Sequence, residues 1–294
     1  MNRTRIGAQQ KGAAPRDPVL IEISEDEMKA VLAPELGGVV MSLSFGGKNI
    51  FRPAASQEAV AADPREAACY PCVPWFSRLF GGLDFDGRHY ELAPTLPVCD
   101  PDHALHGHGW VNPWRVTDQS GDHVACWFDH TPGPGLFPFP FFATQEFSVS
   151  ADQFQIALCV TNSGNAPMPA GLGLHPFFPN TKTSELNFTE YFDQTTPAKG
   201  LSPPEKIEHR GPMTDDPVDY TIKRWDGTAE IVHDGLKIAM HSNARILHLY
   251  SPEEADFYCA EPISHLPGYF GRDILAPQET MDIFLSLSVE NLTC

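Results

Sequence analysis

The chain is short of positive charge and has no long apolar run. Its 294 residues hold 20 Lys and Arg against 38 Asp and Glu, which gives a formal net charge of −18. Nucleic acids and anionic membrane surfaces are bound through clustered Lys and Arg, so we expect neither partner. No stretch approaches the roughly 20 apolar residues of a membrane helix. Residues 1–18 are polar, so we expect no signal peptide.

A paired cysteine framework is also missing. The seven cysteines are odd in number and scattered, which predicts free thiols in a reducing, cytoplasmic compartment. Cys69 and Cys72 have the spacing of a redox or zinc motif, but no second close pair accompanies them. Because prolines stand within and beside this motif, we predict a loop there, without a metal or redox role.

Sustained helical periodicity is absent as well. The chain has 28 prolines, about twice the usual frequency, and each would cost roughly 3 kcal/mol inside a helix. Short runs of alternating apolar residues between glycine turns instead predict antiparallel strands. The expected strands cover 20–24, 29–32, 39–45, 49–51, 124–129, 143–149, 154–161, 170–174, 229–232, 236–240, 246–250, 257–260 and 280–289.

The order of these segments predicts a simple domain organisation. Residues 1–18 are expected to form a flexible arm, and residues 19–294 a single all-β domain, either a sandwich or a barrel. The stretch 55–68 suits a short helix broken at a proline, or a loop. The stretches 69–115 and 200–219 are expected to be irregular, and long irregular segments inside a domain are often functional.

A first candidate site follows from a Gly-rich strand that carries a histidine. On a strand over 170–174 that is continued by one residue, Gly171, Gly173 and His175 face the same side. The two glycines predict an open surface on which a ligand lies flat against the backbone. Pro176 is expected to end the strand and to leave His175 at its end. The alternative is a histidine that caps the strand beside glycine bulges.

A second candidate is a dense histidine cluster formed by His103, His106 and His108. A His-x-His pair suits a metal site of the cupin type, but the residues that follow hold no carboxylate to complete one. A metal-dependent isomerase is therefore a minor alternative. An acid–base or sugar-binding role and an ordinary polar loop both remain open. Trp110 and Trp114 suit sugar stacking, although core packing is the commoner use of tryptophan.

Glu261 and Arg78 are charged residues in apolar surroundings. Alternation places Phe257, Cys259 and Glu261 on one strand face, which predicts a partly desolvated carboxylate. Pro262 is expected to end this strand directly after Glu261. Desolvation raises the pKa of a glutamate toward a value that suits a general base, and pairing with a buried arginine is the structural alternative. Arg78 offers five N–H donors that would orient sugar hydroxyls or pair with an acid.

Taken in chain order, the four segments around Arg78, His106, His175 and Glu261 resemble the aldose 1-epimerase family of galactose mutarotase-like proteins. The resemblance covers about residues 19–289. Gly173-Leu174-His175-Pro176-Phe177-Phe178 is similar to the family's Gly-x-His-Pro-Tyr/Phe-Phe signature. Leu105-His106-Gly107 is similar to its Leu-His-Gly, and Glu261-Pro262 to the Glu-Pro that carries its catalytic carboxylate.

Two further matches concern sugar-binding positions. Arg78 resembles the arginine of the family's Asn-Arg-Ile segment, although Ser77 replaces the usual asparagine. Asp219 stands near the point where the family places a sugar-binding aspartate. Three neighbours compete for that assignment: Asp215, Asp216 and Asp226.

The resemblance implies a large antiparallel β-supersandwich with a sugar in a cleft, and neither a metal nor an organic cofactor. It implies an isomerase of carbohydrate metabolism that interconverts the α and β anomers of a neutral hexose. Glu261 would remove the anomeric hydroxyl proton, His175 would protonate the ring oxygen, and His106 would hydrogen-bond near that oxygen. The expected sugar-binding residues are Arg78, Asp219 and His108, the last being also the alternative to His106.

Two other functions stay open. A hexose-6-phosphate 1-epimerase of the same fold would need a basic pocket, for which Arg78, Arg88 and Arg115 are available, but the net charge of −18 opposes steering of anions. A non-catalytic sugar-binding protein would keep the cleft without accelerating anomer exchange. In each case we expect a monomer or homodimer whose partner is a monosaccharide.

Overall fold

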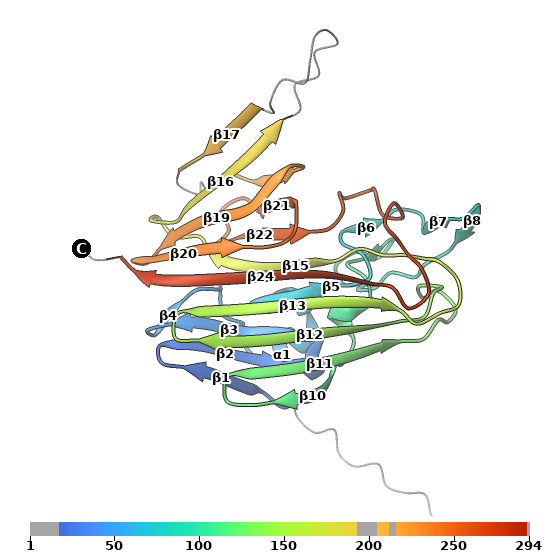
Figure 1. Ribbon diagram of the computed structural model, residues 1–294, viewed down its shortest axis with the longest axis horizontal. Helices are drawn as coiled ribbons and strands as arrows, with labels where there is room; N and C mark the ends of the chain where they lie inside the picture. Colours follow the sequence, from blue (N-terminus) through green and yellow to red (C-terminus); the bar gives the residue numbers. More distant parts are fainter. Residues whose placement is uncertain (1–17, 193–204, 212–215, 293–294) are drawn as a thin grey trace, which may run out of the picture.

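The computed structural model describes residues 18–192, 205–211 and 216–292. Residues 1–17 of the predicted arm and parts of the predicted 200–219 loop lie outside the described residues. Most of the described chain forms two nine-stranded antiparallel sheets, stacked face to face as an all-β supersandwich (Figure 1).

The first sheet has the order β1-β2-β3-β5-β15-β22-β21-β18, with β4 added beside β3. Its strands are β1 (Ile21–Glu25), β2 (Met28–Ala33), β3 (Val39–Phe45), β4 (Lys48–Asn49), β5 (Cys69–Cys72), β15 (Gly173–Pro179), β18 (Val218–Ile222), β21 (Ile246–Ser251) and β22 (Phe257–Ile263).

The second sheet has the order β10-β11-β12-β13-β24-β20-β19-β16-β17. Its strands are β10 (Arg115–Gln119), β11 (His123–His130), β12 (Phe141–Ser150), β13 (Gln153–Asn162), β16 (Glu185–Phe192), β17 (Glu205–His209), β19 (Trp225–His233), β20 (Leu236–His241) and β24 (Thr280–Asn291).

Smaller elements complete the described chain. Three two-stranded ribbons pair β6 (Arg78–Leu79) with β9 (Ala104–Leu105), β7 (Leu83–Phe85) with β8 (Arg88–Tyr90), and β14 (Met168–Pro169) with β23 (Ile274–Leu275). The helical elements are α1 (Gln57–Ala62) and the 3₁₀ turns η1 (Pro34–Leu36), η2 (Pro64–Glu66) and η3 (Gly109–Val111). Within the described ranges, no helix is both long and apolar enough to cross a bilayer.

The hairpin of β12 and β13 shows how the sequence sets the sheet. Phe141, Ala143 and Phe147 are buried at every second or fourth position along β12. The turn between the two strands pairs Val149 with Phe154, which is also buried. Because side chains alternate between faces, this pattern directs one face of the second sheet into the core between the sheets. The predicted strands 143–149 and 154–161 are confirmed within β12 and β13.

The first sheet is apolar on both faces. Leu174, Phe178 and Tyr258 belong to the large core cluster between the two sheets. On the opposite, outer face, Phe177 and Cys259 belong to a second buried cluster. That cluster also contains residues of the segment that precedes the second sheet: Val60, Phe76, Leu105 and Trp110. This segment therefore covers part of the outer face of the first sheet. Neighbouring side chains of β22 belong to different clusters, as the predicted alternation requires.

The segment 69–115 is more regular than predicted. Its Cys69–Cys72 motif forms β5, a central strand between β3 and β15, so the predicted loop is wrong. A single proline within a four-residue strand removes only one N–H donor. Cys69 faces the core between the sheets and Cys72 the outer cluster, and both are free thiols. Their opposite directions are incompatible with a dithiol pair.

The predicted strand ends at Pro176 and Pro262 are also wrong. Strand β15 continues to Pro179 and β22 to Ile263. The two strands pair at Gly173 with Ile263 and again from Phe177 with Cys259, in one unbroken register. Between these points neither proline can donate a ladder hydrogen bond. His175 and Glu261 stand opposite each other within that interval.

Candidate active site

A cleft of about 730 Å³ opens on the outer face of the first sheet. Its sheet-borne lining residues are Tyr70 on β5, His175 and Phe177 on β15, Asp219 and Thr221 on β18, His248 and Tyr250 on β21, and Phe257 and Glu261 on β22. Its sides are formed by residues of the covering segment and of one later loop: Arg52, Arg65, Phe76, Ser77, Arg78, Phe80, His106, Leu266 and Tyr269.

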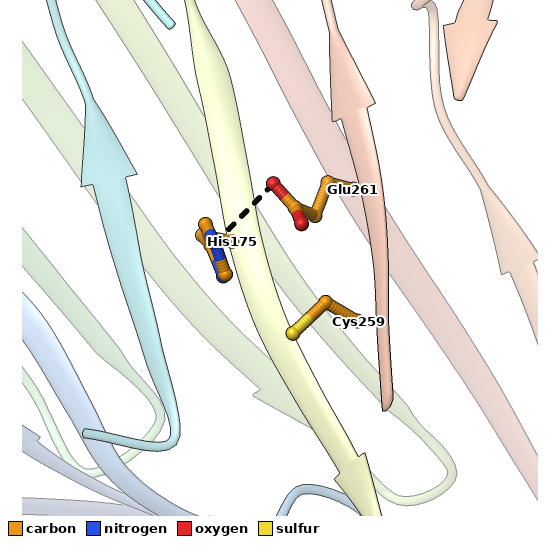
Figure 2. A group of neighbouring side chains, drawn as sticks. All are labelled: His175, Cys259 and Glu261. Carbon is orange, nitrogen blue, oxygen red and sulfur yellow. Dashed lines mark ion pairs between the residues drawn. The ribbon is translucent and has the colours of Figure 1, made fainter. Parts of the chain in front are cut away.

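The centre of the cleft is a histidine and a glutamate in contact. His175 Nε2 lies 3.4 Å from Glu261 Oε2, and the two side chains are 8% and 1% exposed. Figure 2 shows Glu261 and Cys259 projecting from β22 toward the His175 ring on β15. Within the described residues, both Glu261 carboxylate oxygens and His175 Nδ1 are buried without a hydrogen-bond partner. Buried polar groups are usually satisfied, so these atoms are placed for a ligand.

Burial shifts both groups away from their charged forms. Removal from water raises the pKa of Glu261 well above its usual value, with a smaller contribution from the nearby Asp219 charge. Burial lowers the pKa of His175 well below its usual value, and His106 and His248 add to that effect. An ionised Glu261 is therefore a stronger base than an exposed carboxylate, and a protonated His175 is a stronger acid than a free imidazolium.

The His175 ring is fixed by aromatic packing. It stacks on Tyr70 with the ring centroids 4.4 Å apart, and on Phe177 at 4.8 Å. Tyr70 comes from the adjacent strand β5, where it is paired directly with His175. Contact with these two rings restricts the rotamer of the imidazole and holds its Nε2 toward Glu261.

His106 is placed by a tight backbone turn between β9 and η3. His106 and Gly107 both have positive φ, at 54° and 73°. The Trp110 indole donates to the carbonyls of Leu105 and Gly107, which anchors this turn from inside the core. Trp110 and Trp114 are both buried, so the core-packing use of these tryptophans is the one observed.

The hydrogen bonds of His106 define its tautomer. Its Nδ1 accepts the Ser77 N–H at 3.1 Å, so a neutral ring carries its proton on Nε2. Burial lowers the pKa of His106 to about 3, which keeps the ring neutral at pH 7. The ring centroids of His106 and His175 are 5.4 Å apart. His106 therefore offers an Nε2–H donor beside the pair of His175 and Glu261.

His108 is not among the residues that line the cleft. Its Nε2 accepts the Phe137 N–H at 3.1 Å, and its ring stacks on His130 at 4.8 Å. His130 in turn donates from Nε2 to the Phe137 carbonyl at 2.8 Å. The predicted sugar-binding role does not fit this position, because His108 and His130 together hold one peptide group in the wall behind the cleft.

Arg78 and Asp219 both reach the cleft. Arg78 Nε donates to Asp100 Oδ2 at 2.6 Å, and this bond holds the pKa of Asp100 below its usual range. Arg78 thus pairs with an acid and still lines the cleft. Asp219 is 79% exposed, with Oδ1 3.7 Å from His248 Nε2. Among its competitors, Asp216 and Asp226 do not line the cleft, and Asp215 lies outside the described residues.

His248 is a cleft residue that the sequence did not single out. It is paired across the strands with Glu261 on one side and with Thr221 on the other. Its Nδ1 lies 2.8 Å from Thr221 Oγ1. Alternation within the predicted strand 246–250 already set His248 on one face, but only the register of β21 against β22 places it beside Glu261.

The glycines before His175 have a different purpose from the one predicted. A Cβ on Gly171 would lie 2.1 Å from the His265 ring, and one on Gly173 would lie 2.9 Å from Phe76. His265 Nε2 also accepts the Phe76 N–H at 3.0 Å. The expected open surface for a flat ligand is therefore filled by protein side chains, and the glycines allow close packing of the cleft wall.

The chain is similar to known proteins over most of its length. The family model described as aldose 1-epimerase matches residues 19–285. The uncharacterized protein YphB of Escherichia coli K12 is 28% identical over 286 residues, which cover 86% of this chain and 93% of YphB.

Solved structures give the same picture. A crystal structure from Escherichia coli K12, provisionally described as an aldose 1-epimerase, superposes with a TM-score of 0.77 at 26% identity, covering 93% of this chain and 99% of that one. Galactose 1-epimerase from Lactobacillus acidophilus NCFM shares the fold with a TM-score of 0.73 at 14% identity, covering 97% and 98% of the two chains.

Proposed function

Because the chain belongs to the aldose 1-epimerase family, we propose that it is an isomerase that interconverts the α and β anomers of a neutral hexose in this cleft. The observation that carries the proposal is the buried contact between His175 Nε2 and Glu261 Oε2, whose carboxylate has no hydrogen-bond partner within the described residues. A base and an acid in one desolvated cleft are the two groups that opening of a sugar ring requires.

In the proposed reaction the pair acts in the form with Glu261 ionised and His175 protonated. Burial disfavours each of these charges, so this ion pair is a less populated and more reactive form than the neutral pair. Glu261 takes the proton of the anomeric hydroxyl while His175 donates a proton to the ring oxygen, and the bond between C1 and that oxygen breaks. The open aldehyde rotates about its bond to C2, and the ring closes on the other face as both proton transfers reverse. Each correctly placed acid or base contributes roughly 10² to 10⁴ in rate.

The remaining cleft residues hold the sugar in this mechanism. His106 donates from Nε2 to the region of the ring oxygen, where electron density grows as the ring opens. Arg78, whose Nε is engaged by Asp100, presents its other N–H groups to sugar hydroxyls. Asp219 accepts from a hydroxyl at the more exposed end of the cleft.

A phosphorylated hexose is a second candidate substrate, favoured by the cations of the cleft. Besides Arg78, the lining includes Arg52, Arg65 and Lys223, whereas Arg88 and Arg115 do not line it. Arg65 is committed to Asp63 through a 2.6 Å ion pair. The local balance of charge is thus less acidic than the net charge of −18 suggests. We retain the neutral hexose as first choice because the cleft also contains Asp63, Glu66 and Asp219.

Anomer exchange measured by NMR tests the proposal. Glucose, galactose, other aldoses and their 6-phosphates are each supplied at anomeric equilibrium, and exchange is followed with and without the protein. We expect acceleration with at least one neutral hexose. Acceleration confined to the phosphates would assign the second candidate. Saturable sugar binding with no acceleration of any sugar would assign a non-catalytic binding protein.

We place this reaction in the cytoplasm. The described cysteines are all free thiols, namely Cys69, Cys72, Cys99, Cys126, Cys159 and Cys259. Unpaired thiols in this number are typical of a reducing compartment. Fractionation of the native cells tests the location.

A further inference from the structure

Three different metal-ligating side chains lie together at the floor of the cleft, which His175 and Glu261 line and beneath which Cys259 is fully buried. The ligand atoms of His175, Cys259 and Glu261 all lie within 4.8 Å of one another, and all three residues are buried. They come from neighbouring strands, His175 from β15 and the other two from β22 (Figure 2). The proposed isomerase mechanism uses His175 and Glu261 and leaves the Cys259 thiol without a role.

The donor set selects a particular class of cation. Imidazole nitrogen, thiolate sulfur and carboxylate oxygen are the three ligand types of zinc sites, and three protein ligands with an open fourth position are typical of accessible ones. Mg²⁺ and Ca²⁺ prefer oxygen ligands throughout. The set therefore suits Zn²⁺ and chemically similar ions such as Co²⁺ and Cd²⁺.

Charge balance favours the same ion. One thiolate and one carboxylate carry two negative charges, which neutralise a divalent cation bound beside a neutral imidazole. A neutral site is far less costly to bury than an isolated charge. The Glu261 oxygens have no other partner within the described residues, so binding breaks no existing hydrogen bond of that side chain. The Cys259 thiol must give its proton to solvent as the metal–sulfur bond forms.

We propose that His175, Cys259 and Glu261 form an inhibitory site for a thiophilic divalent cation such as Zn²⁺. The cation would occupy the His175 nitrogen and the Glu261 oxygen that the isomerase needs for proton transfer, and sugar and metal would compete for the cleft. Metal binding itself does not depend on the proposed function, whereas the inhibition rests on it.

The direct test uses Co²⁺, which has a thiolate charge-transfer absorption band when bound to cysteine. Wild-type protein is titrated with Co²⁺, and we expect this band with one equivalent bound. Cys259→Ala should abolish the band. Cys126→Ala is the matched control, because Cys126 is equally buried but lies on β11 of the second sheet. A band that survives Cys259→Ala, or none in the wild type, overturns the proposal. This readout needs no enzymatic activity.

The inhibition test uses anomer exchange with Zn²⁺ and with Mg²⁺ at equal concentration. We expect Zn²⁺ alone to inhibit, a chelator to restore the rate, and saturating sugar to raise the Zn²⁺ concentration needed. Cys259→Ala should keep its basal rate and need about tenfold more Zn²⁺ for half inhibition. If Cys259→Ala does not fold, competition between sugar and Co²⁺ in the wild type decides the matter, and unchanged Co²⁺ absorption at saturating sugar contradicts the proposal.

Discussion

The cleft group of His106, His175 and Glu261 can be set beside the wall pair of His108 and His130. Both are buried, and burial lowers the pKa of all four histidines. They differ in their hydrogen bonds. In the wall pair, the Nε2 atom of each histidine is bonded to the peptide group of Phe137, and neither ring has an atom among the buried polar atoms without a partner.

In the cleft group, His175 Nδ1 and both Glu261 oxygens have no partner within the described residues. Leaving such groups unsatisfied costs free energy that a purely structural site would avoid. A buried histidine placed for a ligand thus differs from a structural one by its unused hydrogen-bonding capacity beside a cavity. Burial and a lowered pKa are common to both kinds.

The sharpest test of this comparison replaces Glu261 and, as a control, a buried glutamate outside the cleft whose carboxylate already has a hydrogen-bond partner. Glu261→Gln should lower kcat for anomer exchange about 10³-fold, because the amide cannot accept the hydroxyl proton. Glu190 on β16 is 3% exposed and accepts from the Tyr220 hydroxyl at 3.2 Å. Glu190→Gln should therefore leave kcat within about twofold of wild type. Equal rates for Glu261→Gln and wild type would remove the proposed base.

The two neighbouring histidines should separate activity from stability. His106→Asn should lower kcat/KM about 10²-fold, since the donor near the ring oxygen is lost, while asparagine tolerates the positive φ of this position. His108→Asn should keep most of the activity but lower the free energy of unfolding by about 1–3 kcal/mol, because the buried Phe137 N–H loses its acceptor. Anomer exchange and urea unfolding measure the two effects, and a reversed pattern would exchange the assigned roles.

The wall pair should also make the fold sensitive to acid. Burial lowers the pKa of His108 to about 3 in the folded chain, whereas the unfolded value is about 6.5. Between these values the unfolded chain binds a proton that the folded chain does not, so stability falls as pH falls. His108 should account for about 2 kcal/mol of the stability lost from pH 6 to pH 4. Urea unfolding across this range should show a smaller loss for His108→Asn than for wild type.

The smallest effect is expected at the exposed end of the cleft. Asp219→Asn should raise KM about three- to tenfold with little change in kcat, because one hydrogen bond from a well-solvated carboxylate is worth about 1 kcal/mol. Asp226→Asn is the control, since Asp226 bonds Thr228 and does not line the cleft. Equal KM values for both variants would exclude Asp219 from sugar binding.

The sequence predicted most of the fold and much of the cleft. Alternating apolar residues located the long hairpin strands, and the ordered motifs named five residues that meet in one cavity: Arg78, His106, His175, Asp219 and Glu261. The prediction that a proline ends each of the two central strands was wrong. Pro176 and Pro262 lie inside β15 and β22, because tertiary packing on both faces of the first sheet tolerates the loss of single ladder hydrogen bonds.

Residue types and their period along the strands were thus determined by the sequence alone. Glu261 faces the same side as Cys259 whatever its neighbours are, because strand side chains alternate. Which histidine joins it was decided only by the tertiary structure. His106 and His108 are two residues apart, yet one meets the cleft and the other supports its wall. The turn at His106 distinguishes these two histidines, and the register of β15 against β22 sets His175 opposite Glu261. Both features arise from contacts between residues distant in the chain.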